Sequence, residues 1–121
     1  MVKGVQNLDE FEQIIKGPKV AVYFYATWCA PCNYISSVFE QLEAKCSDVL
    51  CIKVDIDEAQ NISRKLSIRA MPIFIFYQNG KKVHEFTGTN PSTLHNGFKI
   101  VNQAPPDYVS KMERAMYHDS F

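Results

Sequence analysis

Cys29 and Cys32 are separated by two residues and form a C-x-x-C motif, the arrangement with the clearest chemical potential in the chain. Cys29 falls where a helix is expected to begin, and free backbone N–H groups and the positive end of the helix dipole favour a thiolate there. A thiolate attacks disulfides, and Cys32 lies almost one turn further on, close enough to resolve a mixed disulfide. Pro31 lacks an N–H, which costs nothing in the first helical turn. The motif therefore indicates dithiol–disulfide exchange, with Cys29 and Cys32 as catalytic residues.

Metal binding is the chemical alternative for such a motif. A structural zinc ion takes about four ligands, usually from two cysteine pairs. The other cysteines, Cys46 and Cys51, are separated by four residues, and His84, His95 and His118 show no ligand spacing. Cys46 and Cys51 are expected at a helix end and in a buried strand, as surface or core thiols. We therefore expect neither a metal nor a bound cofactor.

The elements on either side of the motif favour redox chemistry over a chance pair of cysteines. Residues 20–26 form a near-continuous apolar run, which is typical of a strand buried on both faces of a sheet. After the motif, one apolar stripe at helical spacing predicts an amphipathic helix. That stripe consists of Ile35, Val38, Phe39 and Leu42.

The rest of the sequence alternates between helix and strand patterns. A short helix begins at Asn7, with Glu10 placed as in a capping box. Asn79-Gly80 is a strong hairpin signal, and Asn90-Pro91 begins a last helix. The remaining predicted elements are strands at 50–54, 73–77 and 83–87 and a helix at 59–66. Their order predicts an α/β fold, with a central mixed β-sheet flanked by helices on both faces.

Composition describes an ordinary globular chain. The 121 residues are 46% apolar and 21% charged, and the formal net charge is zero. This balance does not favour a polyanion, so we expect no nucleic-acid partner. Residues 1–15 lack the apolar run of a signal peptide, and no stretch approaches the roughly 20 apolar residues of a membrane span. We expect a monomer in the cytoplasm, without a membrane partner.

Pro105-Pro106 interrupts the alternating pattern near the end of the chain. It divides the sequence into a domain at 1–104 and a C-terminal tail at 105–121. The tail is either a frayed end or a short helix, and the pattern leaves both open. Its apolar residues at helical spacing are Tyr108, Val109, Met112, Ala115 and Met116.

Four stretches resemble the thioredoxin family, and its eukaryotic cytosolic branch most closely. They follow in family order and are Ala26-Thr27-Trp28-Cys29-Ala30-Pro31-Cys32, Val54-Asp55-Ile56-Asp57-Glu58, Ile68-Arg69-Ala70-Met71-Pro72-Ile73-Phe74 and Phe86-Thr87-Gly88. The resemblance covers the chain from its start to about residue 102 and implies the thioredoxin fold. It also implies a protein-disulfide reductase, with Cys29 as nucleophile and Cys32 as resolving cysteine. Recharging would then come from a flavin- and NADPH-dependent thioredoxin reductase.

A substrate groove beside the motif is also implied by the resemblance. Pro72 matches the proline whose preceding peptide bond is cis in the family, and that bond would turn the Met71 backbone toward Cys29. An extended substrate chain would then pair with this backbone by β-augmentation. We expect Trp28 to be a surface residue rather than a core aromatic, because Thr27 and Cys29 adjoin it. The implied groove residues are Trp28, Ala30, Pro31, Met71, Pro72 and Gly88.

The chain departs from the family pattern within and after the motif. Ala30-Pro31 stands where Gly-Pro is commonest, and alanine favours helix over glycine by about 1 kcal/mol. Asn33 replaces a lysine found in many relatives, so the thiolate lacks one nearby cation. Ser37 replaces a proline that often kinks the helix, so a straighter helix is expected.

The largest departure is Tyr23, where many thioredoxins have a buried aspartate credited with moving the proton of the second cysteine. A phenol has a pKa of about 10 and is not a base at neutral pH. Lys53 matches the lysine beside that aspartate and so loses its partner. Tyr23 is either core filling or a hydroxyl donor on the thiol side, and both interpretations stay open.

Two functions follow from these observations. The first is an enzyme, a dithiol–disulfide oxidoreductase that reduces disulfide-bearing proteins and is recharged by a thioredoxin reductase. The alternative is a redox-switched or redox-poor binding module that uses the same groove, and its support is the missing acid at Tyr23.

Overall fold

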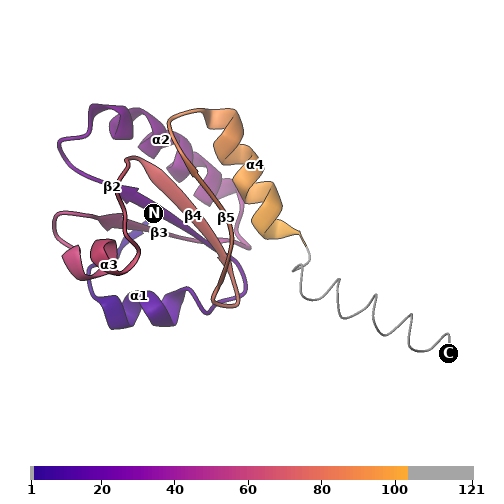
Figure 1. The fold of residues 1–121 in the computed structure, drawn as a ribbon. Coiled ribbons are helices and arrows are strands. Elements are labelled where there is room, and N and C mark those ends of the chain that lie inside the picture. Colours follow the sequence, from indigo (N-terminus) through magenta and orange to yellow (C-terminus); the bar gives the residue numbers. More distant parts are fainter. Residues whose placement is uncertain (1, 104–121) are drawn as a thin grey trace, which may run out of the picture.

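A computed structural model describes residues 2–103 (Figure 1). The tail predicted at 105–121 lies outside the described residues. No helix within residues 2–103 is long and apolar enough to cross a membrane. In chain order the elements are β1 (Lys3–Gly4), α1 (Leu8–Ile14), β2 (Val20–Tyr25), α2 (Ala30–Lys45), β3 (Leu50–Asp55), α3 (Gln60–Lys65), β4 (Ile73–Gln78), β5 (Lys81–Thr87) and α4 (Pro91–Asn102).

The sheet has five strands in the order β1-β3-β2-β4-β5. β3 pairs in parallel with both β1 and β2, whereas β4 pairs antiparallel with β2 and with β5. Figure 1 shows α2 and α4 on one face of this sheet and α1 and α3 on the other. The predicted mixed sheet with helices on both faces is therefore confirmed. The sequence analysis did not predict β1, because its two exposed residues carry no apolar pattern.

Each face of the sheet has its own apolar core, and β2 contributes to both. Ala21 and Tyr23 point into the cluster on the α2 and α4 side. Val20, Val22 and Phe24 point into the cluster on the α1 and α3 side. Burial of such a side chain stabilises the fold by about 1.5–3 kcal/mol. This two-sided burial explains the unbroken apolar run that the sequence shows at β2.

The predicted helix starts at Asn7 and Asn90 and the predicted turn at Asn79-Gly80 are confirmed. The side chain of Asn7 accepts a hydrogen bond from the Glu10 N–H at 3.0 Å and caps α1. Asn90 caps α4 in the same way, through the Ser92 N–H at 2.9 Å. Asn79 and Gly80 form the turn between β4 and β5, with φ angles of 52° and 85°. β5 begins at Lys81, two residues earlier than predicted, because strand pairing continues up to this tight turn.

Candidate active site

Cys29 and Cys32 are joined by a disulfide at the point where β2 leads into α2. Cys29 is the N-cap of α2, with φ −86° and ψ 101°, and its Sγ accepts the Cys32 N–H at 3.3 Å. The two Cα atoms are 5.3 Å apart. The predicted position of the motif, between a buried strand and the start of a helix, is confirmed. A sulfur at this N-cap faces the unpaired N–H groups of the first turn, which favour its anionic form.

The two cysteines differ in their access to solvent. Cys32 is 1% exposed and Cys29 is 6% exposed, so Cys29 is the more accessible of the pair. Ala30 and Pro31, which connect them, are both exposed. The disulfide therefore lies just beneath a surface formed by its own connecting residues, with Cys32 on the protected side.

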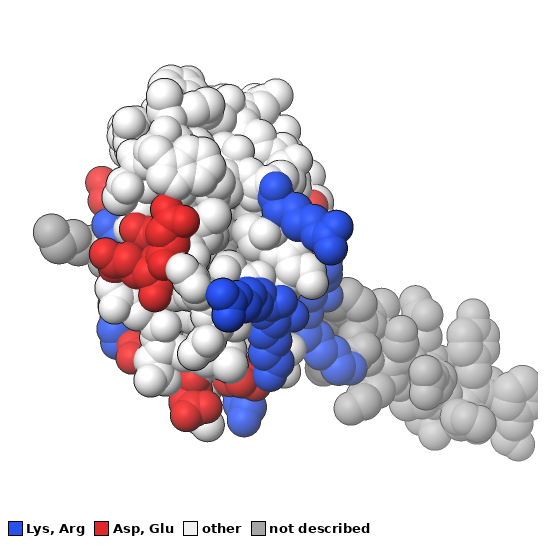
Figure 2. All heavy atoms as spheres, turned by 60° about the vertical axis from the view of Figure 1, so that its left-hand side comes forward, with Lys and Arg blue, Asp and Glu red and all other residues white. Residues whose placement is uncertain are grey.

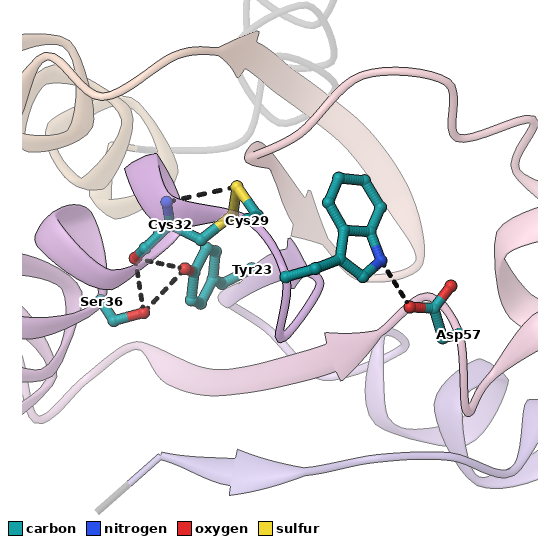
Figure 3. Close-up of a disulfide and its surroundings, with 6 residues drawn as sticks. Tyr23, Cys29, Cys32, Ser36 and Asp57 are labelled. Atoms are coloured by element: carbon teal, nitrogen blue, oxygen red, sulfur yellow. Dashed lines mark hydrogen bonds between the residues drawn. A yellow bond between two sulfur atoms is a disulfide. The ribbon is translucent and has the colours of Figure 1, made fainter.

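Tyr23 lies directly below the motif and contacts Cys32 through its hydroxyl (Figure 3). The side chain is 2% exposed, and its ring stacks on Phe74 at 4.8 Å and on Tyr25 at 5.3 Å between centroids. The hydroxyl donates to the backbone carbonyl of Cys32 at 2.8 Å and lies 2.7 Å from the Ser36 Oγ. Tyr23 thus fills the core and also donates a hydrogen bond, but its acceptor is the Cys32 carbonyl rather than the thiol.

The environment of Tyr23 keeps its phenol neutral. Burial raises the pKa of Tyr23 above 10.0, and the hydrogen bond with Ser36 opposes this shift. Lys53 pairs with Tyr23 across strands, and its Nζ lies 5.9 Å from the centroid of the Tyr25 ring, within cation–π range. The structure therefore places Lys53 over an aromatic ring, with Tyr23 beside it in place of an acid.

Trp28 has the surface position that the sequence predicted, with 67% of its area exposed. Its indole N–H donates to the Asp57 carboxylate at 2.8 Å (Figure 3). The backbone N–H of Asp57 in turn donates to the Asp55 side chain at 3.0 Å. The loop after β3 thereby fixes the orientation of the ring next to Cys29.

Met71, Pro72 and Gly88 lie on the loops that flank β4 and β5. The Met71-Pro72 peptide bond is cis, as the resemblance implied. The Gly88 N–H donates to the Pro72 carbonyl at 3.1 Å, and Met71 packs on the cluster that contains both motif cysteines. Gly88 has φ 122°, and a Cβ built there meets nothing within 4 Å. The structure therefore packs Met71 against the core cluster to which the cysteines belong, and it joins Gly88 to Pro72, with open space beside Gly88.

The stretch that carries the motif exposes large aromatic side chains and has no charged residue of its own. Residues 26–39 contain no Asp, Glu, Lys or Arg. Two large side chains in this stretch, Trp28 and Tyr34, are 67% and 59% exposed. Figure 2 shows a face whose upper part is almost free of charged side chains, with acidic and basic groups gathered below it. The exposed aromatic rings favour apolar contact with a partner, beside the acidic Asp57 that holds the Trp28 ring.

Cys46 and Cys51 are free thiols away from the motif. Cys51 is buried on β3, and this burial raises the pKa of its thiol to about 12. Cys46 is half-buried at the C-cap of α2. Within residues 2–103 no group of three or more His, Cys, Asp or Glu side chains could hold a metal ion.

Sequence reasoning missed two residues of the site. Asp57 lies in a stretch quoted for the resemblance, and the signal was the exposed Trp28, whose N–H needs a partner. Ser36 lies four residues after Cys32, so that its hydroxyl reaches the Cys32 carbonyl at 2.8 Å. Serine commonly bonds back in this way within helices, and that spacing was the available signal.

Comparison with known proteins agrees with this geometry. Residues 2–99 match the family model described as Thioredoxin. Thioredoxin of Gallus gallus is 46% identical over 102 residues, which make up 82% of this chain and 97% of that protein. Among solved structures, Malassezia sympodialis thioredoxin aligns with a TM-score of 0.79 at 36% identity, covering 85% of this chain and 92% of its own. Oxidised mitochondrial thioredoxin 3 of Saccharomyces cerevisiae aligns with a TM-score of 0.77 at 34% identity, covering 81% of this chain and 93% of its own.

Proposed function

This chain belongs to the thioredoxin family and is a dithiol–disulfide oxidoreductase, and we propose that Cys29 is its nucleophile and Cys32 its resolving cysteine. The Cys29 thiolate attacks one sulfur of a substrate disulfide and forms a mixed disulfide, while the other substrate sulfur leaves as a thiolate and takes up a proton. The Cys32 thiolate then attacks the Cys29 Sγ. A Cys29–Cys32 disulfide forms, and the second substrate thiolate leaves. Two electrons have passed from the protein dithiol to the substrate.

The assignment of roles is carried by one observation, the position of Cys29 as the N-cap of α2 with the Cys32 N–H on its sulfur. An N–H donor and the helix dipole stabilise a thiolate at that position, which lowers the cost of forming the nucleophile. Cys32 is the more deeply buried sulfur, and this suits a group that attacks only within the mixed disulfide.

We propose a substrate groove formed by Trp28, Ala30, Pro31, Met71, Pro72 and Gly88. Its support is the exposed ring of Trp28 and the open space beside Gly88. An extended segment of substrate would lie along the Met71 backbone and would place its disulfide over Cys29. Trp28 and Pro31 would contact the apolar side chains of that segment.

The partners follow from the same chemistry. Members of the family reduce protein disulfides and are recharged by a thioredoxin reductase, and we propose a flavin- and NADPH-dependent enzyme of that kind here. We propose a cytoplasmic monomer whose domain ends at residue 104. The Saccharomyces cerevisiae relative is a mitochondrial thioredoxin, and location by cell fractionation would decide between the two compartments.

Reduction of insulin with NADPH and a thioredoxin reductase tests the assignment. Cys29→Ser is expected to abolish turnover, whereas Cys32→Ser is expected to form the first mixed disulfide and then to hold it. Cys46→Ser is the control, because that thiol lies at the other end of α2. Turnover by Cys32→Ser would contradict the roles. If the native chain reduced only one equivalent of insulin disulfide and did not turn over, the result would favour the binding module.

A further inference from the structure

Three oxygen atoms form a closed triangle beneath Cys32. The Tyr23 Oη lies 2.8 Å from the Cys32 carbonyl oxygen, the Ser36 Oγ lies 2.8 Å from the same oxygen, and the two hydroxyls are 2.7 Å apart. Tyr23 comes from β2 and Ser36 from the second turn of α2, as Figure 3 shows. The triangle therefore connects the sheet, the helix and the backbone of the resolving cysteine.

Only two protons are available for the three contacts of this triangle, because each hydroxyl carries one. In one arrangement Ser36 donates to Tyr23 and Tyr23 donates to the carbonyl. In the second, Tyr23 donates to Ser36 and Ser36 donates to the carbonyl. In the third, both hydroxyls donate to the carbonyl. At least one hydroxyl therefore holds the Cys32 carbonyl in every arrangement. The two side chains are interchangeable donors, so either can hold the carbonyl when the other is removed.

The held carbonyl belongs to the third residue of α2, in the turn that also carries the disulfide. Its hydroxyl contacts fix the backbone of Cys32 against β2, and the Cys32 side chain has little freedom at 1% exposure. We propose that Tyr23 and Ser36 are positioning residues that share one task, to hold the Cys32 backbone so that its sulfur is aligned on Cys29. This inference rests on the proposed role of Cys32 as the resolving cysteine.

The step that depends on this alignment is the second half of the reaction. The Cys32 thiolate forms a bond to the Cys29 Sγ, the bond between that sulfur and the substrate sulfur breaks, and the substrate leaves as a thiolate. Such an intramolecular attack is sensitive to small displacements of the attacking atom. The first attack, by Cys29 on substrate, does not involve Cys32 and is expected to be independent of the triangle.

An aromatic disulfide reagent, dithiobis(nitrobenzoate), separates the two steps. Cys29 releases the first thionitrobenzoate at a rate that depends on reagent concentration, and Cys32 releases the second at a rate that does not. Cys46→Ala serves as background because the half-buried Cys46 would also react. Cys51 adds little signal because burial raises its pKa to about 12.

Tyr23→Phe and Ser36→Ala each remove one hydroxyl and leave the other as donor. We expect each single variant to slow the second release less than about twofold, and the double variant to slow it about tenfold. The first release stays unchanged. In a glutathione buffer the double variant's disulfide is expected to lose about tenfold in equilibrium stability, which raises its potential by about 30 mV. Phenylalanine keeps the ring stack and alanine favours helix, so the fold is retained.

The matched control is the double variant Tyr25→Phe with Ser37→Ala, which removes the same groups from neighbouring positions. The Ser37 hydroxyl donates to the Tyr34 carbonyl, not to that of Cys32. The control is expected to match the native chain in both release phases and in potential. The proposal is overturned by an unchanged second phase in the Tyr23/Ser36 double variant, by a full effect of either single change, or by an equal effect of the control. Retention of the second phase in Cys32→Ser would instead contradict the roles of the cysteines.

Discussion

Tyr23→Asp introduces at the centre of the α2 face the carboxylate that many relatives carry, and we expect it to destabilise this chain strongly. The Tyr23 ring is 2% exposed and packs on Phe74 and Phe39 at centroid distances of 4.8 and 5.5 Å. Removing a buried aromatic side chain costs about 3–5 kcal/mol. Small single domains have a total stability of about 5–15 kcal/mol, so the loss is a large share.

This loss in the free energy of unfolding can be converted into a shift of the urea midpoint. With a slope of about 2 kcal/mol per molar urea, a loss of about 4 kcal/mol lowers the midpoint by about 2 M. Tyr23→Phe is the matched comparison, because it keeps the ring stack and leaves the Ser36 hydroxyl on the Cys32 carbonyl. Its loss is expected to stay below about 1 kcal/mol.

The loss of stability in Tyr23→Asp also depends on pH, and burial of the carboxyl decides whether the loss grows or shrinks as pH rises. Desolvation raises the pKa of a buried carboxyl above its unfolded value of about 4. The folded variant therefore binds the proton more tightly than the unfolded chain, and stability falls as pH rises through the folded pKa. The midpoint of the variant is expected to lie further below that of the native chain at neutral pH than at about pH 4. A midpoint unchanged from the native chain at neutral pH would refute the reasoning.

Three further predictions test the packing at Gly97, the hydrogen bond between Trp28 and Asp57, and the C-terminal tail at 105–121. Gly97→Ala is expected to lower stability by about 1–3 kcal/mol in urea denaturation, since its Cβ would lie 2.5 Å from the Phe76 ring and this outweighs the gain in helix propensity. Asp57→Ala is expected to lower kcat/KM for insulin about fivefold, the effect of one lost hydrogen bond to Trp28, without a comparable change in urea midpoint. A chain that ends at residue 104 is expected to keep its stability within about 0.5 kcal/mol and its turnover, and a larger loss would show that the tail belongs to the fold.

Much of the fold could be read from the sequence because its signals are local. The Asn7 and Asn90 caps, the Asn79-Gly80 turn and the apolar stripe of α2 each involve residues close together in the chain. The same holds for the motif, whose helical start placed Cys29 at the N-cap. Neighbouring residues decide such features by hydrogen bonding and steric limits, whatever the rest of the chain does.

Other features depend on contacts between residues far apart in the sequence, and only the tertiary structure decided them. β1 exists because β3 offers a free edge, not because Lys3-Gly4 has strand character. The Trp28 N–H finds Asp57 across 29 positions, and the Tyr23 hydroxyl finds the Cys32 carbonyl across nine. The sequence left Tyr23 open between packing and hydrogen bonding, because the direction of its hydroxyl is set by how α2 lies on β2. That placement results from burial summed over the whole core, which no local pattern contains.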